Sequence, residues 1–408
     1  MKVLLVNKFH YQRGGSETYY LALGRALRKA GHQVVHFAMQ DDRNEPSDTS
    51  DMFVRNIEYN HSEGFWGNLQ VGAQTLYSRS VKHSLVELIA REKPDIAHLN
   101  LFHRQLSLSV VDVLYKANIP IVFTAHDLIC VCPCYTMLSP SGICEKCLQG
   151  HYGACIRQKC VKGSTSKSVL AVLEARLAKM LHTYQKISLY IAPSTFYRDM
   201  LMRGAFTSSP VIHRANFVPG QIERAAVSTP GGPLLYAGRL AGEKGISKLI
   251  EAAARMKVPL HIAGDGPLRE DIARIIAAQG AQEHIKMLGF LDKGELVQAL
   301  KTCRAVVVPS EWYENSPYTV LEAQAAGKPV LCSDIGGLPE LVCDGSNGFL
   351  FAPGDVEGIC TAIVKLNSLT PAAYVAQCDA AFVRAQQQYD EAAYIHWLIG
   401  QYNQILPK

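Results

Sequence analysis

Short apolar runs alternate with helical patterns along most of the chain, and this alternation restricts the fold more than any other sequence feature. The first half begins with the apolar run KVLLVN, continues with the helical pattern SETYYLALGRALRKAG and returns to the apolar run HQVVHFA. Continuous apolar runs are typical of strands that are buried on both faces of a parallel sheet covered by helices. The sequence therefore predicts repeated strand–helix–strand units.

The second half repeats the alternation more regularly, from PLLYAGRL and SKLIEAAARM to RAVVVPS, TVLEAQAAG and KPVLCSD. We therefore expect an α/β protein with two Rossmann-like, doubly wound domains, residues 1–214 and 215–387. Ligands of such sheets bind beyond the carboxyl ends of the strands. The candidate functional residues should lie in the loops that follow strands, and two facing domains would form a cleft.

Composition narrows the class of protein. Hydrophobic residues make up 48% and charged residues 19%, which suits a soluble globular chain. The start, MKVLLVNKFHYQ, is too short for the apolar core of a signal peptide, and no apolar run is long enough to span a membrane, so we expect a cytoplasmic protein.

The net charge of +5 is unevenly distributed. Residues 1–214 hold 25 Lys and Arg against 16 Asp and Glu, whereas the rest of the chain holds 16 against 20. A basic half favours an anionic partner such as phospholipid, nucleic acid or a phosphorylated substrate. A random imbalance of surface charge explains the counts equally well.

Two cations stand in a glycine-rich loop of the second half. The segment AGRLAGEKGISKLIEA places Arg239 and Lys244 between a predicted strand and a predicted helix. Two cations at the carboxyl end of a strand suit a diphosphate, with charge-assisted hydrogen bonds worth about 1.5–3 kcal/mol each. Solvated loop cations are the ordinary alternative.

The segment SEWYENSPYTVLEAQAAGKPVLCSDIGG carries the most information. It predicts a helix with Ser316 as its N-cap and Pro317 at its first position, so that the free N–H groups near Tyr318 and Thr319 form an anion site.

Two carboxylates flank this predicted helix start. Glu314 precedes the helix and Glu322 lies inside it, too far apart to act as a close acid/base pair. We expect one of them to reach the reacting end of a ligand and the other a more remote pair of hydroxyls. For an isolated Glu, a helix-dipole partner or a solvated surface position is the ordinary interpretation.

Three further loops follow predicted strands. IAGDGP contains Gly264, whose missing side chain lets the backbone approach a flat ring. RGGSE places Gly14 and Gly15 before a helix, where an anion is favoured, but it is not the GxGxxG pattern of a dinucleotide site. His126 and Asp127 end the apolar run IPIVFTAHD, although a lone His is more often structural.

Together these segments resemble the family-4 retaining glycosyltransferases of the GT-B fold. GRLAGEKG, IAGDGP and the stretch from Glu314 to Glu322 are similar to the nucleotide-sugar half of that family, and GGSE with His126 is similar to its acceptor half. The resemblance implies an acceptor-side domain over residues 1–214, joined by a C-terminal helix at about 388–408, and a donor domain over 215–387. Many members read Glu-Gly-Phe-Gly where this chain reads Glu314-Asn315-Ser316-Pro317, and Pro317 has no N–H to donate.

The resemblance also implies roles for individual residues. Arg239 and Lys244 would bind the donor diphosphate, Glu322 the ribose hydroxyls and Glu314 the transferred sugar, while His126 would orient that sugar. The catalytic set it implies is His126, Glu314, Arg239 and Lys244. The donor-binding set it implies is Gly14, Gly15, Arg239, Lys244, Gly264, Asn315, Ser316, Tyr318, Thr319 and Glu322.

The activity implied by the resemblance is transfer of a sugar, most often a hexose, from a nucleotide-sugar donor to a growing glycan or lipid-linked acceptor, with retention of configuration, in cell-surface polysaccharide synthesis. We expect no catalytic metal, because the cations and a helix N-terminus can stabilise the leaving diphosphate and the sequence has no Asp-x-Asp motif. We expect no nucleic-acid partner. The alternative is a noncatalytic two-domain protein that binds a nucleotide or sugar.

Seven of the twelve cysteines fall between Cys130 and Cys160. A chain kept in a reducing compartment disfavours disulfides, and Cys144-x-x-Cys147 is a half-site for zinc. Some family members carry a similar insertion, and this resemblance points to Cys132, Cys144, Cys147 and Cys160 as ligands of a structural zinc, with His151 as a substitute. Buried or redox-active thiols, including a thiol oxidoreductase using Cys144 and Cys147, are the alternatives.

The segment STSKSVLAVLEARLAKMLHTYQKI predicts a basic amphipathic helix. Lys167, Arg176, Lys179 and Lys186 stand against the single acidic residue Glu174. Such a helix can lie on an anionic membrane surface, which would suit a lipid-linked acceptor and peripheral contact with the inner membrane. A core helix with one wet face is at least as good an interpretation.

Overall fold

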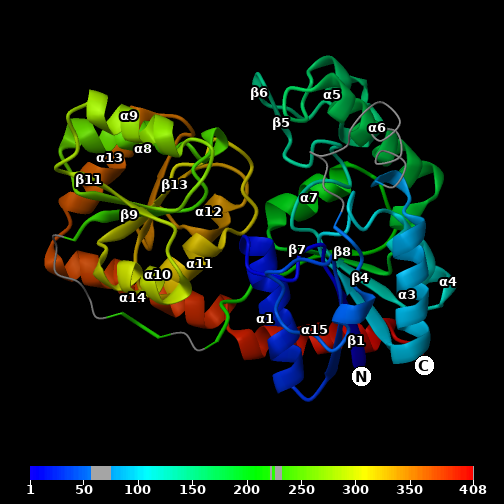
Figure 1. The fold of residues 1–408 in the computed structure, drawn as a ribbon. Helices are drawn as coiled ribbons and strands as arrows, with labels where there is room; N and C mark the ends of the chain where they lie inside the picture. The colour runs from blue at the N-terminus through cyan, green and yellow to red at the C-terminus, as the bar shows by residue number, and fades with distance from the viewer. Residues whose placement is uncertain (57–74, 221–222, 226–231, 408) are drawn as a thin grey trace. The chain divides into compact units, whose positions relative to one another are not determined.

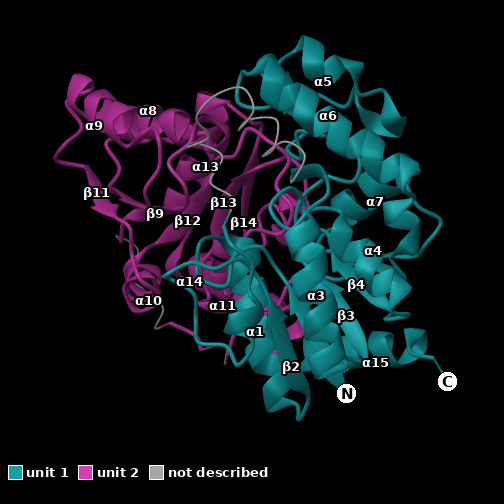
Figure 2. Ribbon diagram, turned by 45° about the vertical axis from the view of Figure 1, so that its right-hand side comes forward, with its two compact units in different colours: residues 1–214, 392–408 teal, residues 215–391 magenta. Residues whose placement is uncertain are grey.

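The computed structural model describes residues 1–407 except for 57–74, 221–222 and 226–231 (Figure 1). The described chain forms two compact units, which Figure 2 shows in two colours. Unit 1 consists of residues 1–214 and 392–408, and unit 2 consists of residues 215–391. Each unit contains one six-stranded parallel sheet, so the α/β fold class predicted from the alternating pattern is confirmed.

The sheet of unit 1 has the strand order β2-β1-β3-β4-β7-β8. Its short central strands β3, β4 and β7 are buried at every position, as expected for continuous apolar runs inside a parallel sheet. The order reverses between β1 and β3, so the loops after these strands diverge there and leave room for a ligand. The strands are β1 (Lys2–Val6), β2 (Gln33–Phe37), β3 (Ile96–Leu99), β4 (Ile121–Thr124), β7 (Leu189–Ala192) and β8 (Val211–His213).

The helices of unit 1 form where apolar residues recur at helical spacing. In α1, for example, Tyr20, Leu23 and Leu27 are buried on one face. The helices are α1 (Gly15–Lys29), α3 (Arg79–Glu92), α4 (Ser109–Lys116), α5 (Gly153–Arg157), α6 (Thr165–Met180), α7 (Thr195–Arg203) and α15 (Glu391–Ile405). The 3₁₀ turns are η1 (Ser50–Met52), η2 (Leu148–Gly150) and η3 (Thr183–Lys186), and the hairpin pairs β5 (Leu138–Ser139) with β6 (Gly142–Ile143).

The last helix, α15, brings the end of the chain back to unit 1. The Tyr402 hydroxyl lies 2.5 Å from Nδ1 of His98 on β3, and the Tyr394 hydroxyl lies 2.7 Å from that of Tyr19 on α1. Both tyrosines are buried. The core of unit 1 is therefore completed by the C-terminal residues.

The sheet of unit 2 has the order β11-β10-β9-β12-β13-β14, which is the Rossmann order 3-2-1-4-5-6. The order reverses between β9 and β12, and the loops after these two strands hold Arg239 and Glu314. The strands are β9 (Leu234–Ala237), β10 (Leu260–Ala263), β11 (Ile285–Gly289), β12 (Ala305–Val308), β13 (Val330–Ser333) and β14 (Gly348–Phe351).

Helices cover both faces of this sheet. Figure 1 shows α8, α9 and α13 on one side and α10 and α11 on the other, and a separate apolar core fills each side. The helices are η4 (Gly242–Lys244), α8 (Ile246–Met256), α9 (Arg269–Ala278), α10 (Lys293–Thr302), α11 (Tyr318–Ala325), α12 (Leu338–Leu341), α13 (Val356–Asn367) and α14 (Pro371–Gln388).

Candidate functional site

In unit 2, Lys244 and Glu314 form an ion pair at the carboxyl edge of the sheet. The Lys244 ammonium lies 2.7 Å from Oε1 of Glu314, which is buried in the loop after β12. Ser310 and Trp312 donate to the same oxygen over 2.6 and 2.9 Å. Burial alone would raise the pKa of Glu314, but Lys244 and the two hydrogen bonds outweigh it, so the pKa is lowered and the carboxylate is charged at neutral pH.

Trp312 also supports the cation. The Lys244 ammonium lies 4.9 Å from the centre of the Trp312 ring, within the range of a cation–π interaction. One indole thus contacts both partners of the ion pair, through its face and through its N–H. The sequence analysis named neither Trp312 nor Ser310, although both follow a buried strand.

Backbone segments pack so closely at this edge of the sheet that glycine is required at two positions. Gly337 N–H donates to the carbonyl of Glu314 over 2.7 Å. Gly336 has a φ of +61°, and a Cβ there would lie 2.5 Å from the same carbonyl oxygen. Gly264 has a φ of +135°, and its Cβ would lie 1.9 Å from the carbonyl of Gly238. The motifs IGG and IAGDGP therefore bring backbone segments together at this edge.

Arg239 is held differently from Lys244. It follows β9, as predicted, but its guanidinium pairs with Glu243 on the same loop and is 58% exposed. The structure thus joins Lys244 to Glu314 and leaves Arg239 at the surface of the loop. Thr319 is anchored to this loop region because its hydroxyl donates to the carbonyl of Ala237 over 3.0 Å.

The start of α11 corrects a prediction. The helix begins at Tyr318 with Pro317 as its N-cap, one residue later than predicted, and no side chain caps it. Ser316 is buried, and its hydroxyl has no hydrogen-bond partner within the described ranges. The predicted cap fails because Pro317 takes an extended conformation (ψ 130°), which places Ser316 outside the helix. Asn315 lies in the same loop before α11.

Glu322 lies inside α11, and the cost of burying its charge is offset far less than for Glu314. It is partly buried, and burial raises its pKa to about 7, while Lys293 lowers it only in part. The Glu322 carboxyl group forms no hydrogen bond or ion pair with the described residues. A half-protonated carboxyl group near neutral pH can both donate and accept hydrogen bonds, which suits hydroxyl groups of a ligand.

In unit 1 the glycine loop lies at the start of α1. Gly14 has an extended backbone (φ −164°), and a Cβ there would lie 3.6 Å from Glu17 Oε2, an ordinary contact. The fold therefore does not require glycine at position 14, and Gly15 is the first residue of α1.

His126 follows β4 at the carboxyl edge of the unit 1 sheet. Its Nε2 lies 2.9 Å from Oδ1 of Asn100, which follows the neighbouring strand β3. The ring of Tyr19 packs edge-on at 5.0 Å between centroids. Burial lowers the pKa of His126 to about 3, so the imidazole is neutral at physiological pH.

Charged residues that the sequence analysis did not single out surround this edge. Lys8 follows β1, and burial lowers its pKa, although the carboxylates of Asp127 and Glu17 offset part of that effect. Arg104, after β3, pairs with Glu174 at 3.8 Å, and its backbone N–H donates to the same carboxylate over 2.9 Å. Burial raises the pKa values of Asp127 and Glu17. Only their position after strands could have identified Lys8 and Arg104 from the sequence.

The cysteine-rich insertion brings several thiols close together. The side chains of Cys132 and Cys134 share a hydrogen bond, which raises the pKa of Cys132. Cys144 and Cys160 both donate to the Gln158 side-chain oxygen, over 3.5 and 3.9 Å. The insertion contains no disulfide, because all of its cysteines are free.

The four predicted zinc ligands do not form a coordination set as they lie. Cys147 is an electrostatic neighbour of Cys132, Cys144 and Cys160, and Cys132 also shares a hydrogen bond with Cys134, which is not one of the four. Across the part of the chain that the structure describes, no group of three or more His, Cys, Asp or Glu side chains is arranged to hold a metal ion. The zinc site therefore stays a prediction.

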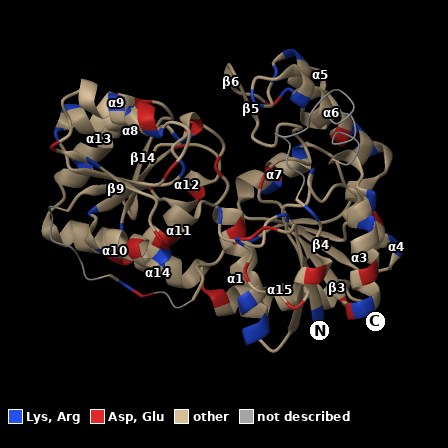
Figure 3. Cartoon of the chain, viewed as in Figure 1, with Lys and Arg blue, Asp and Glu red and all other residues tan. Residues whose placement is uncertain are grey.

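The basic helix predicted near residue 166 is α6, and its exposed face is cationic and apolar. Lys167, Arg176 and Lys179 are exposed, and so are Leu173 (46%) and Met180 (69%). Figure 3 shows cationic positions in the region of α5 and α6. The remaining cation of the segment, Lys186, lies outside α6 and pairs with Asp112 at 2.5 Å. Among the described residues no single helix could span a membrane, although Val356–Asn367 and Pro371–Ile405, bent by 111°, meet the criteria of length and composition together.

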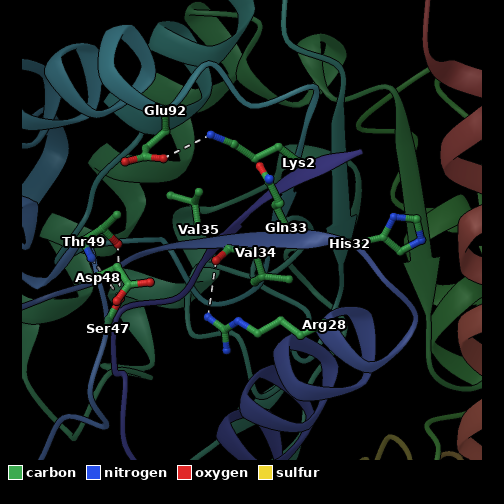
Figure 4. A pocket seen from close by; sticks show the side chains of 10 residues that line it. All are labelled: Lys2, Arg28, His32, Gln33, Val34, Val35, Ser47, Asp48, Thr49 and Glu92. Carbon is green, nitrogen blue, oxygen red and sulfur yellow. Dashed lines mark hydrogen bonds and ion pairs between the residues drawn. The ribbon is translucent and has the colours of Figure 1, made fainter.

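A pocket of about 360 Å³ lies at the opposite edge of the unit 1 sheet (Figure 4). Its lining includes the start of β1 and of β2, with Lys2 paired to Glu92 at 3.2 Å and Arg28 bonded to the carbonyl of Val34. Lys2 is thus paired with a carboxylate, and Arg28 with a backbone carbonyl. Ligands of doubly wound sheets bind at the carboxyl ends of strands, so this pocket is not the candidate site.

Comparisons with known proteins agree with the fold and the motifs. Residues 13–215 match the family model described as Glycosyltransferase Family 4, and residues 226–374 match the model described as Glycosyl transferases group 1. The structure of sucrose-phosphate synthase from Thermosynechococcus elongatus has a TM-score of 0.72 at 18% identity and covers 99% of this chain and 98% of its own. The structure of Anabaena HepE in complex with UDP and glucose has a TM-score of 0.71 at 19% identity and covers 99% and 100%.

Several of the curated relatives carry the names of sugar-transferring enzymes. An alpha-D-kanosaminyltransferase from Streptomyces kanamyceticus is 28% identical over 45% of this chain, and a protein in the cps region of Klebsiella pneumoniae is 25% identical over 84% of this chain and 87% of its own length. The chain spans 52% of the kanosaminyltransferase and 39% of a Mycobacterium tuberculosis glycogen synthase, about half or less of these relatives. The two adjoining family matches and the two Rossmann-like units together show that the chain belongs to the family-4, group 1 glycosyltransferases and has the GT-B fold.

Proposed function

We propose that the protein is a retaining glycosyltransferase that moves a sugar, most often a hexose, from a nucleotide-sugar donor to a growing glycan or lipid-linked acceptor in cell-surface polysaccharide synthesis. The observation that carries the proposal is the ion pair between Lys244, after β9, and the buried Glu314, after β12, because the strand order of unit 2 reverses between these two strands. Nucleotide ligands of this sheet type bind at that point. The HepE structures with UDP and UDP-glucose support a nucleotide-sugar as the donor.

Unit 2 would bind the donor. Lys244 and Arg239 would receive the diphosphate, whose growing negative charge on bond cleavage is stabilised by cations already in place. Glu322 would bind the ribose hydroxyls, and the close-packed loop at Gly264 would lie against the base. Glu314 would contact the transferred sugar through its second oxygen, since its first one already accepts three hydrogen bonds.

The N-terminal end of α11 would complete the anion site. The backbone N–H groups near Tyr318 and Thr319, with the segment Asn315–Ser316, would face the phosphates or the sugar, as the resemblance implies. Unit 1 would contribute His126 to orient the sugar and the Gly14–Gly15 loop to approach the phosphates. The proposal needs no catalytic metal, and we expect transfer to persist in EDTA.

The experiment combines binding with turnover. A thermal-shift panel of nucleoside diphosphates and their sugars identifies the donor, because a ligand of the folded form raises the melting temperature. Arg239→Ala and Lys244→Ala should each lower transfer by about 10²-fold or more. Lys248→Ala, which removes a 45% exposed side chain of α8 that pairs with Glu251, should not. Donor binding without turnover in any acceptor screen would contradict the enzyme and favour a noncatalytic binding protein.

Retention of the anomeric configuration is tested by a separate measurement. Proton NMR of the first product formed distinguishes the two anomers before they equilibrate. We expect the product to keep the configuration of the donor sugar. An inverted product would contradict the proposed mechanism while leaving the donor assignment intact.

We propose peripheral contact with the cytoplasmic face of the membrane through α6. Its one acidic residue, Glu174, is buried against Arg104, so the exposed face carries positive charge beside the exposed Leu173 and Met180. Anionic lipids attract such a face by about 1 kcal/mol per cation. Vesicles of phosphatidylglycerol and phosphatidylcholine should bind the protein, and vesicles of phosphatidylcholine alone should not.

The matched variants change the same charge on different surfaces. K167E/R176E/K179E should abolish vesicle binding, whereas K257E/K286E/K301E, on exposed positions of unit 2, should preserve it. Equal loss in both triple variants would show a nonspecific charge effect and contradict a role for α6.

We further propose, from the resemblance alone, a structural zinc on Cys132, Cys144, Cys147 and Cys160. Binding would require the Gln158 side chain to leave the thiols of Cys144 and Cys160. Elemental analysis of protein purified without chelator should find one zinc per chain, lost in C144S/C147S and kept in C343S, at an exposed thiol of unit 2. A stable, zinc-free wild-type protein would contradict this.

A further inference from the structure

Asn100 lies against the imidazole of His126. The two residues follow β3 and β4, which pair directly in the sheet, so both stand at its carboxyl edge. Oδ1 of Asn100 lies 2.9 Å from Nε2 of His126, and Asn100 is fully buried. The direct pairing of β3 with β4 therefore brings the first residues of the two following loops together.

This contact determines which ring nitrogen of His126 carries the proton. An amide oxygen can only accept a hydrogen bond, so Nε2 must donate. At neutral pH the ring carries a single proton, because burial lowers the pKa of His126 to about 3. The groups that face the ring include Asn100, the Tyr19 ring on α1 and His98 on β3, whose own pKa is lowered by burial to about 3. Asn100 thus holds His126 in the neutral Nε2–H form.

A second asparagine shows what a purely structural contact looks like at the same edge. Asn7 follows β1 as Asn100 follows β3, and it is equally buried. Both ends of its amide are bonded, Nδ2 to the carbonyl of Phe9 over 2.8 Å and Oδ1 to the N–H of Leu101 over 2.9 Å. Asn7 ties together the loops after β1 and β3, and folding alone accounts for it.

Asn100 differs because one end of its amide is unsatisfied. Its Nδ2 is buried and has no hydrogen-bond partner within the described ranges. A buried unsatisfied donor costs about 1–3 kcal/mol, so an apolar residue or a fully bonded amide would serve folding better. Such a cost is expected where a group is kept for function.

We propose that Asn100 is a positioning residue for His126: its side-chain oxygen fixes the imidazole in the Nε2–H form, and its unsatisfied N–H is left for an oxygen atom of the bound ligand. The proposal rests on the role of His126 in the proposed function. It adds a residue that no sequence motif marked, and it assigns a protonation state to the imidazole that would orient the sugar.

The first test needs no substrate. Long-range ¹H–¹⁵N spectra of ¹⁵N-histidine-labelled protein, with His126 assigned through His126→Gln, report which ring nitrogen is protonated. Wild-type protein should show neutral His126 with the proton on Nε2 from pH 8 down to pH 5. Asn100→Ala should give a mixture of the two neutral forms, and Asn100→Asp should make His126 take up a second proton within that pH range.

The second test measures turnover with the donor found by thermal shift. Asn100→Ala should lower kcat about tenfold or more with a smaller change in the KM of the donor, since the loss is in orientation rather than binding. Asn100→Asp keeps an acceptor oxygen, so its activity should recover towards wild type at high pH and fall as the pH drops. Wild-type activity should show no such fall between pH 8 and pH 5.

Asn7→Ala is the matched control. It removes the other buried asparagine of the same edge and should lower the melting temperature while leaving the His126 spectrum unchanged. The proposal is overturned if Asn100→Ala keeps the proton on Nε2, or if its kcat falls only in proportion to the loss of folded protein. If no donor is found at all, the proposed function fails, and the spectra still decide the protonation state.

Discussion

At the scale of single residues, the charges of Lys244 and Glu314 compensate each other in the chain without ligand. The ammonium lies 2.7 Å from the carboxylate, so the charge that would meet a diphosphate is already neutralised in the free chain. A bound phosphate must compete with Glu314 for Lys244, and success would free the carboxylate. Ligand binding and the charge of Glu314 are therefore coupled.

Trp312→Phe tests this coupling. The substitution keeps an aromatic face for Lys244 but removes the N–H that donates to Oε1 of Glu314. Because that bond favours the charged form, its loss should raise the pKa of Glu314 and move the acid limb of the pH–rate profile to higher pH. Trp397→Phe, on α15 of unit 1, is the control and should leave the profile in place. An unshifted acid limb in Trp312→Phe would show that Glu314 does not govern it.

Glu322→Gln should separate stability from binding. Burial raises the pKa of Glu322 from 4.5 to about 7 in the folded chain, so the stability present below pH 4.5 is lost as the pH rises towards 7. The variant escapes this loss, and its Tm should exceed that of wild type by at least about 2 °C at pH 8 but not at pH 4.5. Thermal melts at both pH values check this, with exposed Glu283→Gln as control.

The same variant should bind the donor more weakly. An amide donates and accepts, but it lacks the charge that a carboxylate offers to two hydroxyls. Gain in stability with loss of affinity is the pattern expected of a functional group kept at a cost to folding. Unchanged affinity would remove Glu322 from the donor site.

At the scale of elements, two glycines that each precede a helix differ in whether the fold requires them. Gly245, between η4 and α8, has a φ of +66°, and a Cβ there would lie 1.8 Å from the carbonyl of Pro309, just before Ser310 and Glu314. Gly14, before α1, has neither restriction. The first glycine is required by packing, and the second is open to a functional explanation.

Alanine at these two positions should have opposite effects. Gly245→Ala should cost about 1–3 kcal/mol of stability through backbone strain and displace the loop that carries Glu314. Gly14→Ala should leave the melting temperature unchanged but lower transfer several-fold, because the new methyl group occupies the approach to the phosphates. Thermal melts and initial rates measure both. Full activity in Gly14→Ala would contradict close approach of a ligand to this loop.

The elements were predictable where the pattern is periodic. The apolar runs KVLLVN and IPIVFTAH became β1 and β4, since a buried parallel strand needs only continuous hydrophobicity. Less periodic boundaries were missed, as at α11, where Pro317 is the cap rather than the first helical residue. The start of α14 was not assigned either, although Thr370 and Pro371 mark it.

The site was predictable only as far as its motifs reach. Arg239, Lys244 and Glu314 stand in recognisable loops, but their pairing does not follow from spacing: Glu243 lies near enough in sequence to hold Arg239, and Glu314 reaches Lys244 across 70 positions. Asn100 ends an ordinary apolar run, and only the pairing of β3 with β4 shows that it meets His126.

At the scale of the whole molecule, the buried histidines are concentrated in unit 1. Burial lowers the pKa of His10 to about 4 and those of His98 and His126 to about 3, and it lowers those of His36 and His103 well below the ordinary value. Tyr20 bridges His10 and His36 through one hydroxyl. Each of these rings is neutral in the folded unit.

We therefore expect unit 1 to unfold at a higher pH than unit 2 when the solution is acidified. The unfolded chain binds protons at these histidines below about pH 6.5, whereas the folded unit does not, so the stability of unit 1 falls as the pH drops from 6.5 towards 4. Hydrogen exchange followed by mass spectrometry at pH 7 and pH 5, corrected for the intrinsic rate, should show protection lost first in β1 to β4. Equal loss in β9 to β14 would contradict this.

The two units also differ in whether their residues are continuous in the chain, and this difference affects the order in which they can fold during synthesis. Unit 2 is continuous, but unit 1 needs Tyr394 and Tyr402 from the far end of the chain to satisfy Tyr19 and His98. During translation all residues of unit 2 are synthesised before the last helix of unit 1. A stalled or shortened chain would thus carry a finished unit 2 and an unfinished unit 1, and we expect chaperones and proteases to act on the unfinished unit.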